Sequence, residues 1–292
     1  MTIRLFSSED VGAPALGQTA GDFITILRAC LVDGYGTRTA QGWSMPYSNL
    51  PEQAAFQTVG GNDVLRVNNE NYQYAHLTAY ASMSDIDTGV EPYPDNAADL
   101  AVNQFWRTGI RGSSNTFYGK WWVISDDEWF YFYAPHDTAT PSDPMGFFFG
   151  QYDCIEPTFT ANYVLTGYSA TETTVSTSSV ENGLFAEADL WCRRDYRNIA
   201  GFRLDARRDF EAVNYQYPSR LTGSIAWERV KIRSDFAPYD YYGTFPEYYR
   251  AMTTSDYDLS PMGALITING DNYLQMTQST NVIAVKYDVA VG

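Results

Sequence analysis

GAPALGQTAGDFITILRACLVDGYGTRTAQGWSMPY, residues 12–47, holds the clearest helix signal in the chain. Apolar side chains recur there at helical spacing, and we expect them to form one buried face: Phe23, Ile26, Leu27, Cys30 and Leu31. Thr19 stands three residues before Asp22, as in a capping box, and Gly34 and Gly36 interrupt the pattern. The stretch therefore predicts an amphipathic helix between two glycine turns, packed on the sheet that follows.

The rest of the chain changes to a period of two, which is typical of β-strands. The first ten residues indicate a short strand, and further strands are expected at residues 64–67, 72–81, 120–125, 129–133, 147–149, 150–153, 184–192, 201–204, 221–232, 265–268, 273–277 and 281–291. We expect turns at residues 68–71 and at Asn269 with Gly270, loops at 85–96 and 135–146, and a short helix at 97–106. The predicted fold class is mainly β (α+β), with antiparallel, sandwich-like sheets, one packed N-terminal helix and few short helices.

A Ser/Thr-rich segment, YSATETTVSTSSVENG at residues 168–183, is typical of a hinge. It divides the 292 residues into a helix-plus-sheet domain at 1–167 and a β-rich domain at 184–292. No internal repeat supports another division.

The composition is globular and unusually aromatic. Hydrophobic residues make up 45% of the chain and aromatic residues 16%, with 23 Tyr, 16 Phe and 7 Trp. Such rings serve either as cross-strand packing in a β-protein or as contact area at interfaces, and both uses stay open at this point.

The net charge of −16 argues against direct binding of nucleic acid and of anionic membranes. The arginines cluster locally, and each could pair with an acidic partner or with acids of its own chain: Arg193, Arg194, Arg197, Arg203, Arg207 and Arg208. No apolar stretch of about 18 residues exists, so no membrane insertion is expected.

The three cysteines, Cys30, Cys154 and Cys192, lie far apart and form no metal-binding spacing. This usage is typical of a protein folded in a reducing cytosol, and the first ten residues lack the apolar run of a signal peptide. No cofactor and no metal are predicted.

Patterns of catalytic residues are missing or ambiguous. His76 lies on a predicted strand whose one face carries Tyr74, Thr78 and Tyr80, which favours a structural histidine, and His136 lies in a polar loop. No GxSxG motif occurs, and the glycines around Tyr35 follow a helix rather than a strand, so they are no phosphate loop.

Three groups of acids could support a glycosidase pair or a calcium site: Asp85 with Asp87, Asp126 with Asp127 and Glu128, and Asp137 with Asp143. Solvated turns give the same pattern in a chain with 35 acids. We therefore predict no catalytic, cofactor-binding or metal-binding residues, and a protein that is not an enzyme.

The stretch 12–47 resembles a family of tailed-bacteriophage virion proteins encoded among tail structural genes. The shared motifs, in order, are Gly12-Ala13-Pro14, Leu16-Gly17, Ala29-Cys30-Leu31-Val32, Gly34-Tyr35-Gly36 and Gly42-Trp43. The similarity continues through residues 65–67, 81–89, 92–94, 121–124, the turn at Asp126, and 150–153, and so covers about the first 155 residues. The second half is similar only in outline.

The resemblance implies a structural subunit in the tail, neck or collar, or tail tip, assembled in the host bacterial cytoplasm and located in the virion. Its partners would be other virion proteins and copies of itself, and no catalytic residues are carried over. Two alternatives stay open from the residues alone. One is a glycan-binding or receptor-binding module that uses rings such as Trp129 and Tyr131. The other is a carbohydrate-active enzyme that uses paired acids.

Overall fold

The computed structural model describes residues 2–17, 19–71, 74–93, 104–107, 119–135, 144–154, 162–167, 189–192, 202–204, 227–234, 241–251, 263–278 and 281–288. Within these ranges the chain is mainly β, with antiparallel sheets of 13, five and two strands and one short helical segment. The predicted fold class is confirmed.

The elements follow in chain order: β1 (Arg4–Ser7), α1 (Asp22–Arg28), η1 (Ala29–Asp33), β2 (Ser44–Asn49), β3 (Gln53–Gln57), β4 (Val64–Asn71), β5 (Tyr74–Tyr80), β6 (Ser82–Asp85), β7 (Thr88–Val90), β8 (Gln104–Arg107), β9 (Trp122–Ser125), β10 (Trp129–Pro135), β11 (Pro144–Gln151), β12 (Asp153–Cys154), β13 (Tyr163–Gly167), β14 (Asp189–Cys192), β15 (Phe202–Leu204), β16 (Trp227–Ser234), β17 (Tyr241–Ala251), β18 (Ala264–Ile268), β19 (Asp271–Gln278) and β20 (Asn281–Tyr287).

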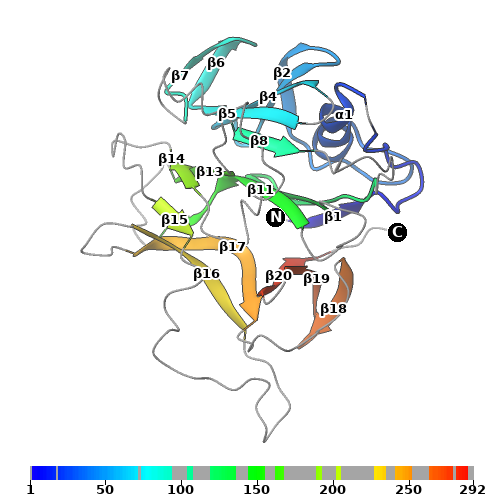
Figure 1. Cartoon of the computed structure of the whole chain (residues 1–292), viewed down its shortest axis with the longest axis vertical. Coiled ribbons are helices and arrows are strands. Elements are labelled where there is room, and N and C mark those ends of the chain that lie inside the picture. The colour runs from blue at the N-terminus through cyan, green and yellow to red at the C-terminus, as the bar shows by residue number, and fades with distance from the viewer. Residues whose placement is uncertain are drawn as a thin grey trace, which may run out of the picture.

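The elements form three layers (Figure 1). The five-stranded sheet, ordered β2-β3-β4-β5-β8, makes one outer layer together with α1. The 13-stranded sheet turns back on itself, so that β1, β9, β10, β11 and β13 form the middle layer and β16, β17, β20, β19 and β18 the other outer layer. Ile3, just before the end strand β1, and Asp288, just after β20, connect these two layers, because the N–H of Asp288 donates to the carbonyl of Ile3 at 3.0 Å.

The middle layer is buried on both faces. Phe130 and Phe132 point into a first core shared with α1 and the five-stranded sheet, and Tyr131 and Tyr133 point into a second core shared with β16 to β20. A strand covered on both faces carries a continuous apolar run rather than an alternating one. The aromatic richness of this region is therefore used for packing between layers.

The predicted helix face is confirmed. Phe23, Ile26, Leu27, Cys30 and Leu31 are all 0% exposed, and α1 continues as the π-helical turn η1 up to Asp33. The face packs against both neighbouring sheets, not only the one that follows in sequence. The Phe23 ring meets the rings of Phe132 and Phe147 of the large sheet, with centroids 4.9 and 5.9 Å apart.

The start of α1 differs from the predicted capping box. Its N-cap is Gly21, at φ 86°, and Asp22 accepts the N–H of Thr19 at 3.1 Å. The buried side chain of Asn69 satisfies the free end of the helix, since its Oδ1 accepts the N–H groups of Gly21 at 3.0 Å and of Phe23 at 3.2 Å. The turn predicted at residues 68–71 is wrong, because these residues belong to β4, which runs to Asn71. An irregularity in the pairing of β4 with β5 turns the Asn69 side chain inward, toward the helix.

The two glycine motifs of the opening stretch touch each other. Gly12 and Gly36 both have left-handed backbones, at φ 81° and 54°. A Cβ on Gly36 would lie 2.1 Å from the carbonyl oxygen of Val11, so the backbones can approach only because both residues lack side chains. Asp10 stabilises this contact between the two motifs. It forms an ion pair with Arg38 and accepts a hydrogen bond from the Tyr35 hydroxyl at 2.8 Å.

Several expected elements need correction. The helix expected at 97–106 is wrong for Gln104 to Trp106, which lie in β8 and pair with β5. The loop expected at 85–96 contains part of the hairpin β6–β7, and the loop at 135–146 gives way to β11 from Pro144. Strands β3, β13 and β17 were not expected at all.

In the second half, the hairpin turn of Asn269 and Gly270 is confirmed, with φ of 54° and 92°. The expected strand at 184–192 is described only for Asp189–Cys192, and the expected hinge at 168–183 lies outside the described residues. β13 and β14, on either side of that segment, pair in one sheet. The division into two domains stays a prediction.

Candidate functional site

Within the described part of the chain, the histidines and arginines singled out from the sequence do not come together in a site. His76 is half-buried on β5, and the residues on the opposite face of that strand, Ala75, Leu77 and Ala79, belong to the first core. His136, Asp137, Asp143 and five of the six clustered arginines lie outside the described residues, and Arg203 lies in β15.

Asp85 and Asp87 stand at the tip of the hairpin β6–β7 as structural residues. Asp87 forms an ion pair with Arg66 of β4, and Asp85 accepts the N–H of Ile86 at 2.7 Å. The Arg66 guanidinium also donates to the carbonyl of Ile86 at 2.8 Å. Asp87 and the Ile86 carbonyl therefore hold the hairpin on the five-stranded sheet, whereas Asp85 stabilises the turn itself.

The turn between β9 and β10 holds the second acidic group. Asp126 is only 3% exposed, and its Oδ1 accepts the N–H groups of Glu128 at 2.7 Å and Trp129 at 2.9 Å. Its carbonyl accepts the indole N–H of Trp43 at 2.8 Å. Asp126 therefore belongs to a buried, hydrogen-bonded turn and not to a solvated loop.

The two neighbouring acids join further segments to this turn. Asp127 accepts the side-chain N–H of Gln41 at 3.0 Å, and its carbonyl accepts the N–H of Val59 at 3.0 Å. Glu128 accepts the hydroxyl of Tyr163, and burial, together with this hydrogen bond, raises the pKa of that phenol. All three carboxylates are occupied by the fold rather than aimed at a shared substrate position.

Asp126 should make stability depend on pH. Burial raises its pKa to about 7, although the two N–H groups that it accepts favour the charged form. In an unfolded chain an aspartate titrates near pH 4, so the stability that the neutral form contributes is complete below about pH 4 and is lost as the pH rises to about 7.

We expect Asp126→Asn to become progressively more stable relative to the parent chain over that window, by up to about 1.4 kcal/mol per pH unit. The amide keeps the acceptor oxygen and cannot ionise. Urea unfolding at a series of pH values measures this difference. Asp85→Asn, at an exposed carboxylate, is the matched control, and parallel profiles for Asp126→Asn and the parent would contradict the assignment.

The described residues contain no group of three or more His, Cys, Asp or Glu side chains that could hold a metal ion. Cys30 is fully buried, and burial raises the pKa of its thiol well above the ordinary value, which suits a core residue and not a nucleophile.

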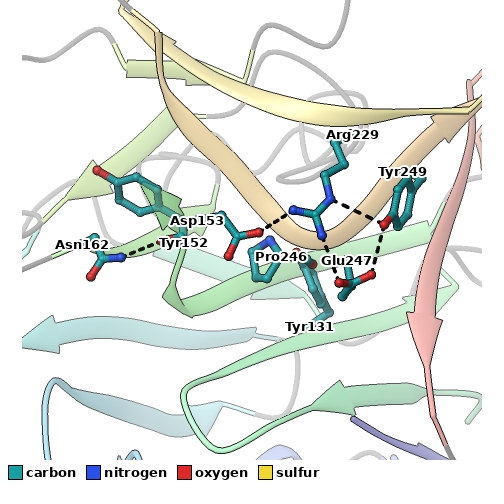
Figure 2. Close-up of polar contacts among 8 residues, drawn as sticks. All are labelled: Tyr131, Tyr152, Asp153, Asn162, Arg229, Pro246, Glu247 and Tyr249. Carbon is teal, nitrogen blue, oxygen red and sulfur yellow. Dashed lines mark hydrogen bonds and ion pairs between the residues drawn. The ribbon is translucent and has the colours of Figure 1, made fainter. Parts of the chain in front are cut away.

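A charged cluster that sequence reasoning missed lies on the outer layer (Figure 2). We call it the Arg229 cluster; its members are Asp153, Arg229, Glu247 and Tyr249. The Arg229 guanidinium contacts Asp153 at 2.6 Å and Glu247 at 2.9 Å, and its carbon lies 5.7 Å from the centre of the Tyr249 ring. The Tyr249 hydroxyl and the second Glu247 oxygen lie 3.1 Å apart.

An irregularity in β17 builds this cluster. Arg229 of β16 pairs with Tyr249, whereas Lys231 pairs with Thr244, so a longer segment of β17 bulges opposite a shorter one of β16. On its other side β17 pairs first with β12, which carries Asp153, and then with β20. Glu247 sits in the bulge at φ 51°, a left-handed conformation that bulges use to re-aim a side chain. The Tyr131 hydroxyl supports the bulge by donating to the Pro246 carbonyl at 2.8 Å.

The left-handed backbone of Glu247 leads to a paired prediction. Glu247→Ala removes the ion pair and keeps the strained conformation, whereas Glu247→Gly removes the ion pair and relieves the strain. We expect the alanine variant to be less stable than the glycine variant by about 1 kcal/mol. Urea denaturation of both variants checks this, and a glycine variant that is the less stable of the two would refute it.

The surface continues from Tyr249 to its neighbours. The Tyr273 ring packs edge-on against Tyr249 with centroids 5.7 Å apart, and Lys286, beside Tyr273, pairs with Asp271 at 3.1 Å. Both acids around Arg229 form ion pairs with its guanidinium, so the arrangement does not resemble a general acid and base. Half-exposed arginine and tyrosine side chains, fixed by their own hydrogen bonds, are instead typical of protein interfaces.

The comparisons with known proteins give no family. No protein-family model matches the chain, and no curated protein matches its sequence. Within the described residues, none of the helices is both long and apolar enough to span a membrane.

Proposed function

We propose that the protein is a structural subunit of a tailed-bacteriophage virion that acts through contacts with other virion proteins and with copies of itself. The observation that carries the contact role is the Arg229 cluster with Tyr249 and Tyr273. It presents the residue types that are enriched at interfaces, held in place on the outer layer.

The assignment to a phage particle rests on the N-terminal resemblance. The structure adds a reason why its glycines matter, because Gly12 and Gly36 meet at a contact that no side chain fits. The described acids of the first two predicted groups serve as structural ties, which favours contact over catalysis.

The rings that suggested glycan binding do not support that alternative. Trp129 is 4% exposed and Tyr131 is 0% exposed, so neither presents a face on which a sugar could stack. We therefore rank the glycan-binding module below the structural subunit.

Mass spectrometry of purified particles of the encoding phage tests the proposal. We expect the chain to be present at a fixed stoichiometry relative to the other structural proteins. Particles that infect normally and lack this chain would refute it.

A further inference from the structure

β18 is an edge strand without the usual protection against pairing. In the part of the chain that the structure describes, β19 is the one strand that pairs with it. Edge strands are commonly protected by charge, proline or a bulge. β1 carries Arg4, and β2 carries Pro46 and an irregular register, whereas β18 reads ALITI and pairs regularly with β19.

Apolar side chains lie on both faces of β18, and Thr267 shares the face of Leu265. Leu265 pairs with Leu274, and Leu274 with Val285, so all three lie on the face that belongs to the second core. Leu274 and Val285 are 0% exposed, yet Leu265 is 57% exposed. On the opposite face Ile266 and Ile268 are only half-buried. Among the described residues, the second core therefore continues to the sheet edge without a strand or helix that covers it there.

The hairpin geometry determines which backbone groups face outward. Ile268 and Asp271 flank a two-residue turn and so form a hydrogen-bonded pair, as Ile266 then does with Tyr273. Hydrogen-bonded and non-bonded pairs alternate along an antiparallel ladder. The N–H and C=O groups of Leu265 and Thr267 consequently point away from β19, toward the open edge.

We propose that β18 pairs with β18 of a second copy, antiparallel, across a two-fold axis at Ile266. Leu265 of one copy then exchanges both backbone hydrogen bonds with Thr267 of the other, and the two Ile266 residues face each other. Ala264 stands opposite Ile268, a small residue against a large one. The pairing is isologous, so the same edge serves both copies.

The charges favour a second copy at this edge. β18 has no charged residue, and the closest charges on its sheet, Asp271 and Lys286, neutralise each other at 3.1 Å. In the proposed register Ile268 of one copy stands opposite Ala264 of the other. The residues next to them on the two β19 strands are Asp271 and Gln275, so no like charges face each other across the interface. The net charge of −16 still opposes association at long range, so the dimer should tighten as salt is added.

The β18 dimer rests on the proposed function, because that function has the chain act by assembly. Sedimentation velocity of the full chain tests the dimer independently of the virion role. We expect a dimer for the parent chain. Thr267→Pro removes an outward N–H and leaves the backbone ladder to β19 intact, losing toward that strand only the side-chain hydrogen bond of Thr267 to Asn272. Leu265→Lys places a charge at the exposed edge and leaves that hydrogen bond in place. Both variants should dissociate the dimer at least tenfold more readily. Val90→Lys is the matched control, since Val90 is 59% exposed on β7, and it should leave the dimer intact.

Cross-linking tests the register. Facing residues of a non-hydrogen-bonded pair lie about 4.5 Å apart at Cα, within reach of a disulfide. Ile266→Cys should therefore cross-link two copies on mild oxidation, whereas Ile268→Cys and the parent chain should not. A monomeric parent chain, edge variants that dimerise like the parent, or cross-links through Ile268→Cys alone would overturn the proposal. If the chain is found in particles but is monomeric in solution, only the β18 dimer is rejected. If the chain dimerises through β18 but is absent from particles, only the virion role is rejected.

Discussion

Leu27→Asp should lower the free energy of unfolding by at least about 3 kcal/mol at pH 7. Leu27 is 0% exposed in the first core, where α1 contacts both sheets. The substitution removes about 2 kcal/mol of apolar burial and places an unpaired carboxylate where no water reaches it. Urea denaturation followed by tryptophan fluorescence measures the loss.

Two control variants separate these effects. Leu27→Met keeps the volume and should cost less than about 1.5 kcal/mol. Thr25→Asp places the same new side chain on the exposed face of the same helix, near its N-terminus, and should be close to neutral. If Leu27→Asp unfolds at the same urea concentration as Thr25→Asp, the helix does not pack as described.

Gly36→Ala is expected to have a similarly large effect from a single methyl group. The new Cβ would lie 2.1 Å from the Val11 carbonyl oxygen, and the backbone at φ 54° disfavours any side chain. The strained conformation accounts for about 1 kcal/mol and the displacement of backbone for about 2 kcal/mol more. Thermal and urea unfolding give the total, which we expect to be about 3 kcal/mol.

Gly61→Ala isolates the clash from the backbone strain. Gly61 has φ 71°, and a Cβ there would meet nothing within 4 Å. This variant should therefore show only the conformational cost of about 1 kcal/mol. Equal losses for the two variants would mean that the contact between the two glycine motifs does not contribute to stability.

The sequence predicted best where one local rule determines the structure. The helical spacing around Phe23 and Leu27 identified the buried face, and the dipeptide of Asn269 and Gly270 identified a hairpin. β8 was mistaken for helix because its pairing with β5 determines its conformation. β17 was missed because Pro246 and the left-handed Glu247 interrupt its alternation, and these are the residues that build its bulge.

Local sequence patterns could not predict the Arg229 cluster, for a related reason. Arg229 and Asp153 are far apart in sequence and meet only because β12 and β16 flank β17. The acidic turn shows the opposite error. Its three acids indicated solvent exposure, yet Asp126 is buried, because its backbone partners and Trp43 enclose it. Only the three-dimensional pairing of strands distinguishes these acids from solvated ones.

The two-sided burial of the middle layer has a consequence for synthesis of the chain. β9, β10 and β11 leave the ribosome before β16 to β20, which cover the Tyr131 side of these strands. Until those later strands are made, the nascent protein displays a broad aromatic surface on strands with high β-propensity, a combination prone to aggregation. The second core can therefore be completed only after β16 to β20 have been made, and co-expression with a general chaperone should increase the soluble yield.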